Sequence, residues 1–399
     1  MAKSAMLGAA RRGEPSRRVA IVLVVACALA ACAPTAGRPP QPPNPGGSPS
    51  GASPPSAGVS SEAPASAAGS PPGLGGVGGA APRQMTKLSL AQAVPAMAFA
   101  PVMLARDAGL FAEEGIDLDH QIGGSAANSL AALQSGEVHL MAGGGDTLLT
   151  AYEKRLDAVA IAGVTTANLF SWAVGNRFLE QKGVGRQSPL AERVAALRGA
   201  RVGTANIGGL GHRLGNFMLA HSGYDGDSYV EWAAAGTGTA LAAALRESKV
   251  DVIFNGVPDP EFVEDAGIGQ VYIIMAEEFP VTQSFVHNAL AAKRQWAEAN
   301  PDLAQRAARA IGRAANRLRN DPEGSKQALQ GAYPALKPSV MDLALAHAKP
   351  AFAPDARMTE TMWRNTIEVY RATGTVSNDI SPAEGAYWTN KYLVDVPSQ

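Results

Sequence analysis

This chain of 399 residues contains two cysteines and has a formal net charge close to zero. Each of these two features excludes a class of protein. The two cysteines, Cys27 and Cys32, stand near the N-terminus, so the long remainder has no thiol for a disulfide, a cysteine-ligated metal or a cysteine nucleophile. A formal net charge of −1 at pH 7 gives no electrostatic footprint for nucleic acid. We therefore expect no nucleic-acid partner.

Familiar catalytic constellations are also missing from the sequence. The six histidines are scattered without a pair at the i, i+4 spacing of a helical metal site, and no G-x-S-x-G elbow is present. The segment GGLGHR at 208–213 is followed by no Gly-Lys-Ser/Thr and lacks the glycine spacing of a dinucleotide fingerprint. We expect no metal, no cofactor and no enzymatic activity.

Residues 17–32, RRVAIVLVVACALAAC, join a basic start to an apolar run that ends in small residues. The run is shorter than the roughly 20 apolar residues of a membrane-spanning helix, and its flanks are those of a secretory signal. The small residues before Cys32 resemble the lipobox of bacterial lipoproteins, which implies cleavage before a diacylated Cys32. We predict a signal peptide at 1–31 and an exported protein anchored by lipid on the periplasmic or extracellular face of a membrane.

Residues 33–84 consist almost wholly of Pro, Gly, Ala and Ser, as in PPQPPNPGGSPSGASPPS. Such a stretch cannot bury enough apolar surface to offset its ordering entropy, so together with Cys32 it is expected to be a disordered tether (32–84). Residues 1–31 carry five basic side chains and one acidic one, and their removal changes the net charge from −1 to about −5. Attachment to the membrane is therefore expected from lipid, since no basic patch is available.

From Met85 the sequence pattern becomes that of an α/β unit. Short apolar runs alternate with helical patterns, which is typical of βαβ units and a mostly parallel sheet. The predicted strands cover 86–94, 117–121, 138–142, 158–162, 201–204, 229–233 and 251–255. The predicted helices cover 99–106, 126–134, 147–154, 210–221 and 240–247, with tail helices at 293–300, 302–319 and 359–373. Because the pattern restarts near Leu197, two similar lobes with a groove between them are expected.

Five loops of small residues stand where a predicted strand ends and a helix begins: 95–99, 123–125, 143–147, 206–212 and 236–239. The carboxyl ends of strands form the ligand crevice of open α/β sheets, and glycine lets a ligand approach the backbone. We predict a small-ligand site there. Plain turn chemistry is the alternative, with Ser125, Asp146 and Thr237 capping helices.

Two further pairs of residues have two interpretations each. His212 and Arg213 fall in the first turn of the helix at 210–221, where they either meet an anionic group of a ligand or are solvated. Phe170 and Trp172 either pack on the apolar part of a ligand or belong to the core. Asp259, followed by Pro260, has the pattern of a helix cap.

Four segments together resemble one known family: VPAMAFAPVMLARDAGLFAEEGIDLDHQIGG, AALQSGEVHLMAGGG, LRGARVGTANIGG and AALRESKVDVIF. They are similar to the solute-binding proteins of ABC importers, in the branch that binds nitrate, aliphatic sulfonates and taurine together with thiamine pyrimidine precursors. The resemblance covers about residues 86–285.

This resemblance implies a type II periplasmic-binding fold, with two α/β lobes and a ligand cleft between them. Lobe 1 is expected at 85–173 and 286–399, including the C-terminal helices, and lobe 2 at 174–285, with crossings near Ser171–Val174 and Thr282–Val286. The implied function is capture of a small organic solute or oxyanion (a sulfonate, nitrate, taurine or a pyrimidine-like compound) by cleft closure. The implied partners of the monomeric protein are the permease and ATPase subunits of an ABC importer.

Carried over by position, and with His212 added from the helix start, the expected ligand contacts are Pro95, Ala96, Phe99, Gly124, Ser125, Gly145, Asp146, Thr147, Asn206, Gly208, Gly209, His212, Gly236 and Thr237. Asp146 departs from the family pattern, in which small or neutral residues are common at this place. A carboxylate facing the cleft disfavours a sulfonate or nitrate and favours a neutral or cationic ligand, whereas a capping Asp146 has no such effect.

Two other functions stay open at this point. An exported ligand sensor or protein-partner-binding domain uses the same lobes. The thiamine-pyrimidine synthases share the fold, but they are cytoplasmic and have a cysteine-rich cluster with a Lys and a His for pyridoxal phosphate. The signal segment and the missing thiols oppose the synthase alternative.

Overall fold

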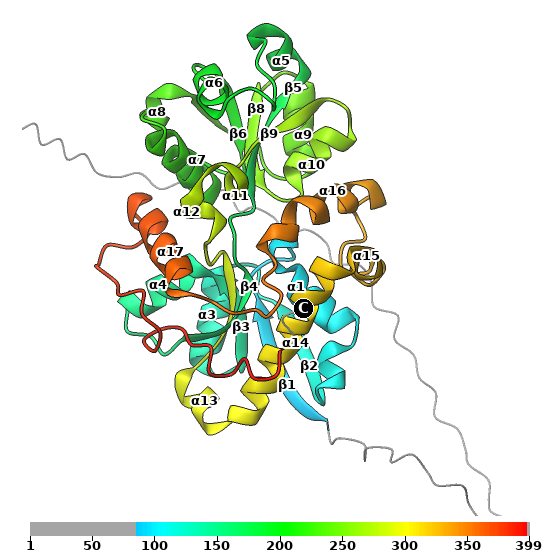
Figure 1. Ribbon diagram of the computed structural model, residues 1–399, viewed down its shortest axis with the longest axis vertical. Coiled ribbons are helices and arrows are strands. Elements are labelled where there is room, and N and C mark those ends of the chain that lie inside the picture. The colour runs from blue at the N-terminus through cyan, green and yellow to red at the C-terminus, as the bar shows by residue number, and fades with distance from the viewer. Residues whose placement is uncertain (1–84, 397–399) are drawn as a thin grey trace, which may run out of the picture. The chain divides into compact units, whose positions relative to one another are not determined.

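The computed structural model describes residues 85–396 (Figure 1). The predicted signal peptide, the predicted lipidation of Cys32 and the predicted tether lie outside the described residues. Residues 85–396 form two five-stranded sheets, each covered by helices.

The first sheet has the strand order β2-β1-β3-β10-β4. Its strands are β1 (Thr86–Gln92), β2 (Ile116–Ile122), β3 (Leu140–Gly144), β4 (Val159–Thr165) and β10 (Asn288–Ala292). The pairs β1–β2 and β1–β3 are parallel, whereas β10 is antiparallel to both β3 and β4. β4 is buried along its whole length, as its apolar sequence VAIAGVT predicts, and the edge strand β2 alternates polar and apolar residues.

The second sheet repeats this plan with the order β7-β6-β8-β5-β9. Its strands are β5 (Phe170–Gly175), β6 (Arg201–Thr204), β7 (Glu231–Ala234), β8 (Val252–Gly256) and β9 (Gly269–Ile274). Here β5 is the antiparallel strand between β8 and β9. Each sheet therefore contains one antiparallel strand at the same place in the order.

Helices follow most of the strands and cover both sheets (Figure 1). The first lobe contains η1 (Met97–Phe99), α1 (Ala100–Asp107), α2 (Leu110–Glu113), α3 (Ala126–Ser135) and α4 (Gly145–Glu153). The second contains α5 (Asn176–Lys182), α6 (Leu190–Ala196), α7 (Leu210–His221), α8 (Gly226–Tyr229), α9 (Thr239–Arg246), α10 (Asp259–Asp265), α11 (Met275–Glu278) and α12 (Pro280–Gln283). The tail contains α13 (Arg294–Ala299), α14 (Pro301–Asn320), α15 (Pro322–Gln330), α16 (Pro338–Ala348), η2 (Lys349–Ala351) and α17 (Glu360–Ala372).

The sequence pattern predicts β1–β4 and β6–β8 to within a few residues, as well as the tail helices α13, α14 and α17. It does not predict β5, β9 and β10. Each sheet is mostly parallel, as expected, and contains in addition one antiparallel strand that the sequence pattern did not predict. Among the residues described, no helix is both long and apolar enough to cross a membrane.

The chain crosses between the sheets twice, and the two crossing segments are hydrogen-bonded to each other. The first leads from β4 to β5 through residues 166–169, and the second leads from β9 through α11 and α12 to β10. Asn168 N–H donates to the carbonyl of Thr282 (2.9 Å), Phe285 N–H to that of Thr166 (3.0 Å) and His287 N–H to that of Thr165 (2.9 Å). This paired backbone is the only strand-like link that the described residues provide between the lobes.

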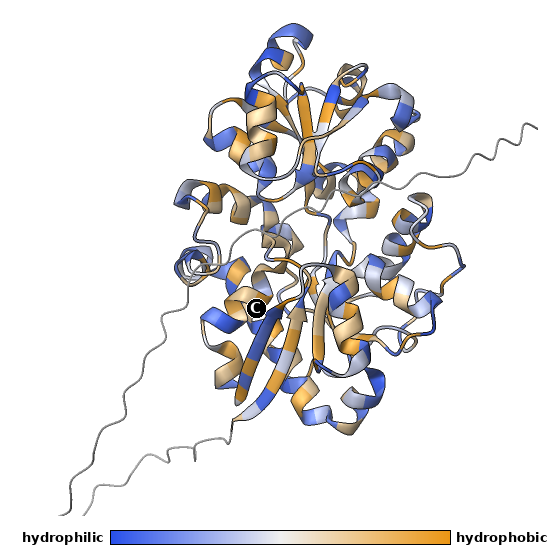
Figure 2. Ribbon diagram, turned by 180° about the vertical axis from the view of Figure 1, so that it is seen from behind, coloured by the Kyte–Doolittle hydropathy of each residue, from blue (hydrophilic) through white to orange (hydrophobic). Residues whose placement is uncertain are grey.

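The apolar core runs along both sheets, and Figure 2 shows hydrophobic residues along the central strands and polar residues on the outer helix surfaces. The tail helix α14 has one face in the apolar core and another that carries charged side chains. Its alanines, such as Ala304, Ala307 and Ala308, are fully buried at helical spacing. On another face, Arg309 and Arg313 form ion pairs with the buried Glu114 (2.9 and 3.3 Å) and hold α14 against α2.

The tail helix α16 adds a separate contact between the lobes, because it packs on α10 of the second lobe. His347 of α16 lies 2.7 Å from the carboxylate of Glu261, which is completely buried. Asp265 of the same α10 accepts from Lys337 (3.1 Å) and from Ser339. Burial by itself lowers the pKa of His347, but the hydrogen bond and charge of Glu261 outweigh it and raise that pKa above its ordinary value. Glu264 adds to this increase in pKa, and Arg186 opposes it.

We predict that His347→Gln lowers the thermal midpoint most at acidic pH. Protonated His347 stabilises the folded chain fully below the unfolded pKa of about 6.5, and this contribution is lost as the pH rises through the higher folded pKa. Loss of a hydrogen bond between charged groups costs about 2 kcal/mol. Thermal melts at about pH 5 and about pH 9 measure the difference. His221→Gln, at an exposed position, is the control, and a deficit independent of pH contradicts the prediction.

A second prediction concerns Gly145, the first residue of α4, where the backbone just before β10 passes very close. The Gly145 N–H donates to the carbonyl of His287 (3.0 Å), and a Cβ at this position would collide with the carbonyl oxygen of Val286. Gly145→Ala is expected to lower the free energy of unfolding by about 1–3 kcal/mol. Gly331→Ala, with nothing within 4 Å, is the matched control. Equal urea midpoints for the two variants would refute the close-packing role.

Candidate ligand-binding site

A cavity of about 610 Å³ lies between the two sheets, at the carboxyl ends of β1, β3 and β8. The first lobe contributes residues 93–96, 98 and 99 after β1, Ala126 of α3, and Gly144, Asp146 and Thr147 at the start of α4. The second lobe contributes Leu210, Thr237 and residues 255–259. The crossing segments supply Leu169, Phe170, His287 and Asn288. The cavity therefore touches both lobes and the segments that connect them.

Six of the residues predicted as ligand contacts line this cavity: Pro95, Ala96, Phe99, Asp146, Thr147 and Thr237. The other eight do not line it: Gly124, Ser125, Gly145, Asn206, Gly208, Gly209, His212 and Gly236. Their contact with a ligand stays a prediction.

Several of these eight residues have other contacts that the structure describes. Ser125 caps α3, because its hydroxyl accepts from the backbone N–H of Asn128 (3.1 Å). Asn206 and Gly208 are exposed in the loop before α7. His212 lies 3.4 Å from the Asp227 carboxylate and edge-on to Trp232, with ring centroids 5.0 Å apart.

Asp146 does not occupy the capping position of α4. The N-cap is Gly144, and Asp146 stands in the first turn and lines the cavity, while its contact with a ligand stays a prediction. Burial raises the pKa of Asp146, although the N–H and hydroxyl of Thr147 and the charge of Arg213 act in the opposite direction. The Thr147 hydroxyl lies 3.3 Å from the carboxylate.

A second carboxyl group, Asp259, lines the cavity from the opposite lobe. It makes no capping hydrogen bond, in contrast to its sequence pattern. Instead it accepts from the side-chain amide of Asn255 (2.6 Å) and from the backbone N–H of Gly238. Burial raises the pKa of Asp259, the two hydrogen bonds oppose this increase, and the nearby Glu261 adds to it.

The end of the second crossing segment and the first residue of β10 bring two polar residues to the cavity, His287 and Asn288, that sequence reasoning did not select. Asn288 donates to the carbonyl of Ala98 (3.4 Å) and to the hydroxyl of Thr165 (3.2 Å). Its amide nitrogen therefore already has partners within the protein. His287 is 7% exposed, and its Nδ1 is buried without a hydrogen-bond partner among the described residues. Burial lowers the pKa of His287 to about 4, so its imidazole is neutral at neutral pH. Since β10 was not predicted, no sequence signal pointed to these two residues.

Apolar side chains form most of the cavity wall. Phe170 lies at the centre of an aromatic group, with ring centroids 5.5 Å from Phe254 and 6.0 Å from His287. Trp172, in contrast, is fully buried in the core. Of the two aromatic residues considered from the sequence, Phe170 alone reaches the cavity. The site combines a large apolar surface with a few polar groups, as small-molecule sites do.

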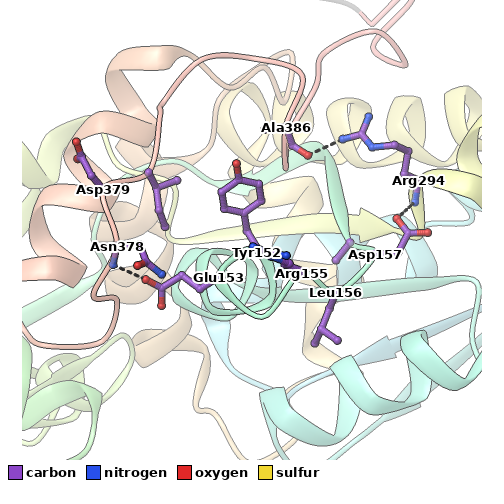
Figure 3. A pocket seen from close by; sticks show the side chains of 11 residues that line it. Tyr152, Glu153, Arg155, Leu156, Asp157, Arg294, Asn378, Asp379 and Ala386 are labelled. Atoms are coloured by element: carbon purple, nitrogen blue, oxygen red, sulfur yellow. Dashed lines mark hydrogen bonds between the residues drawn. The ribbon is translucent and has the colours of Figure 1, made fainter.

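A second depression, of about 550 Å³, lies on the first lobe between the end of α4, the start of β4 and residues 378–386 (Figure 3). Several of its charged groups already have partners. Glu153 accepts the N–H of Asn378 (2.6 Å), and Arg294 donates to the carbonyl of Ala386 (2.6 Å). It involves only one lobe, so the interlobe cavity is the candidate site. Within residues 85–396 no group of three or more His, Cys, Asp or Glu residues is arranged to hold a metal ion.

Solved structures with a similar fold include two sulfonate-binding proteins. The alkanesulfonate-binding protein SsuA of Xanthomonas axonopodis pv. citri, bound to MOPS, is 18% identical with a TM-score of 0.55, covering 74% of this chain and 96% of that one. The periplasmic aliphatic sulphonate binding protein SsuA of Escherichia coli is 17% identical with a TM-score of 0.56, covering 72% and 85%.

A eukaryotic protein has the same architecture. The CA3427 gene product of Candida albicans, described as having the generic periplasmic binding protein fold, is 11% identical with a TM-score of 0.53, covering 77% of this chain and 97% of that one. At such identities the likeness establishes the fold alone, and it confirms the predicted two-lobed α/β architecture. No curated protein matches the sequence significantly.

The sequence profile of the NMT1/THI5-like family matches residues 96–325, which is more than half of the chain. This match confirms the resemblance seen in the sequence segments between Val94 and Phe254. The chain therefore belongs to the NMT1/THI5-like family and has the fold of periplasmic binding proteins.

Proposed function

We propose that this protein is the extracytoplasmic solute-binding component of an ABC importer, and that it acts by binding rather than by catalysis. The observation that carries the proposal is the cavity of about 610 Å³ whose wall is shared by both lobes and by the two crossing segments. A solute in such a cavity contacts both lobes at once only when they are close together.

The mechanism follows from this shared wall. Because ligand contacts are complete only in the closed arrangement, a bound solute shifts the equilibrium between open and closed lobes by its difference in affinity for the two. The paired crossing segments are the natural hinge, since rotation there changes the lobe separation without disturbing either sheet. The closed form is the species that the permease and ATPase subunits receive.

The similar structures support a binding role, because two of them are described as sulfonate-binding proteins. In line with the sequence, we propose that the ligand is a small organic solute or oxyanion of the kinds that the family resemblance implies. The protein is proposed to act as an exported monomer, with Cys32 carrying the lipid that anchors it and residues 33–84 holding the lobes away from the membrane.

We predict that a thermal-shift screen of the full chain against alkanesulfonates, taurine, nitrate, pyrimidines, amines and aromatic carboxylates gives a hit within one chemical class. A ligand that binds only the folded state adds about 2.7 kcal/mol at a hundredfold excess over Kd. Small-angle X-ray scattering should then show compaction. Ala126→Trp, which fills the cavity, should remove the shift, whereas Ala127→Trp at the neighbouring exposed position should keep it. Tight binding without compaction, or no hit in any class, contradicts the proposed mechanism.

The proposed anchor has its own test. Cys32→Ser removes the thiol that receives the lipid, so the protein should move from the membrane fraction to the soluble fraction when cells are fractionated. Cys27→Ser, inside the proposed signal peptide, should leave the distribution unchanged. Continued membrane retention of the Cys32→Ser protein counts against lipidation.

A further inference from the structure

The wall of the interlobe cavity is apolar and contains no cation. Alanine, valine, leucine, proline and phenylalanine side chains make up most of it, and no lysine or arginine is among the described residues that line it. His287, the one residue of the lining that can gain a positive charge, has its pKa lowered to about 4 by burial and is neutral at neutral pH. An anion entering this cavity would lose its hydration and find no opposite charge.

The charged groups that do line the cavity are two carboxyls, and they come from opposite lobes. Asp146 belongs to α4 of the first lobe and Asp259 to α10 of the second. Neither forms an ion pair with any residue between 85 and 396, so their hydrogen bonds come from neutral donors such as Thr147 and Asn255. Each carboxyl has several lone-pair sites, so these contacts leave room for further donors.

Arg213 is the basic residue that acts on Asp146 through its charge, so its position decides whether it serves a ligand. It stands on α7, outside the cavity lining, and its guanidinium donates to the carbonyl of Gly208 (3.4 Å). The charge of Arg213 favours an ionised Asp146, but burial outweighs it and raises the pKa of Asp146 overall. Arg213 is not among the residues that line the cavity, so the wall itself presents carboxyl groups and no cation.

An unpartnered buried group points independently to a bound molecule. The Nδ1 atom of His287 has no hydrogen-bond partner among the described residues, although the side chain is 7% exposed and lines the cavity. Buried polar atoms are nearly always paired, so an orphan in the wall of a cavity indicates a place for a polar atom of a ligand or for a water molecule.

We propose that the cavity takes an apolar solute with an amino nitrogen, held between Asp146 and Asp259, and that it disfavours oxyanions. This inference rests on the proposed solute-binding function and names its ligand class. The apolar wall buries the hydrocarbon part, and the ammonium group donates charge-assisted hydrogen bonds to carboxylates. Because the two carboxyls belong to different lobes, one amino group that reaches both joins the lobes directly.

Calorimetric titration of the full chain with four probes of one size tests the ligand class: 2-phenylethylamine, 2-phenylethanol, phenylacetate and phenylmethanesulfonate. The amine should bind at least about tenfold more tightly than either anion. Asp146→Asn and Asp259→Asn should each weaken the amine by roughly tenfold to a hundredfold, the range for hydrogen bonds to charged groups, and should change binding of the uncharged alcohol little. Asp117→Asn removes the same charge at an exposed position of β2 and should leave all four affinities unchanged.

Three results overturn the ligand class. They are tighter binding of an anion than of the amine, unchanged amine affinity in both cavity variants, and no binding of any of the four probes. The proposed function survives the first two of these results if Ala126→Trp still abolishes binding, because a solute then occupies the cavity with different chemistry. The proposed solute-binding function is contradicted together with the ligand class when none of the four probes binds and the broader thermal-shift screen is also negative.

Discussion

The pairing of the two crossing segments is the constraint on which the rest of the molecule depends. Hydrogen bonds between residues 165–168 and 282–287 join the sheets and fix the place where they meet. The same segments carry Leu169, Phe170 and His287 into the cavity wall. The proposed hinge and part of the proposed binding surface thus belong to the same segments of backbone, so any change in the lobe angle also moves part of the cavity wall. In addition, α16 ties the tail to α10 at a second point, which restricts how far the lobes can separate.

Family membership and ligand chemistry are set by different parts of the structure. The sheets, the crossings and the helix starts make the fold, and folds of this kind carry many functions. In our proposal the ligand is decided by the few side chains at those helix starts that line the cavity, such as Asp146 and Asp259. Burying two carboxyl groups is costly, and their hydrogen bonds to Thr147, Asn255 and Gly238 offset part of that cost. Structural likeness at less than a fifth identity therefore says little about what enters this cavity.

Local rules predict a large part of this architecture. Strand and helix periodicity finds the parallel βαβ units. The rule that ligands sit at the carboxyl ends of strands selects Pro95, Asp146 and Thr147, which the structure places in the wall of the interlobe cavity. The antiparallel strands escape this reasoning, because FSWAVG and NALAA are short apolar runs whose pairing is decided by distant partners. For the same reason nothing local reveals that His287 lies in the wall, or that the close passage of the backbone just before β10 requires a glycine at position 145. The sequence pattern of Asp259 predicts a helix cap, but its carboxyl group accepts hydrogen bonds from Asn255 and Gly238 instead. A capping pattern therefore does not reveal the tertiary partners of a carboxyl group.

The strand order also dictates when each lobe can be finished as the chain is made. The second sheet is drawn from one continuous stretch, β5 to β9, so it can close as soon as residue 274 is available. The first sheet cannot, because the strand that joins β4 to the rest of the sheet is β10, which comes more than a hundred residues later. Until then β3 and β4 have open edges at the centre of the sheet, where exposed strand edges invite wrong pairing. Completion of the first lobe therefore waits for the second, and the first lobe is the part of this chain most exposed to misassembly during synthesis.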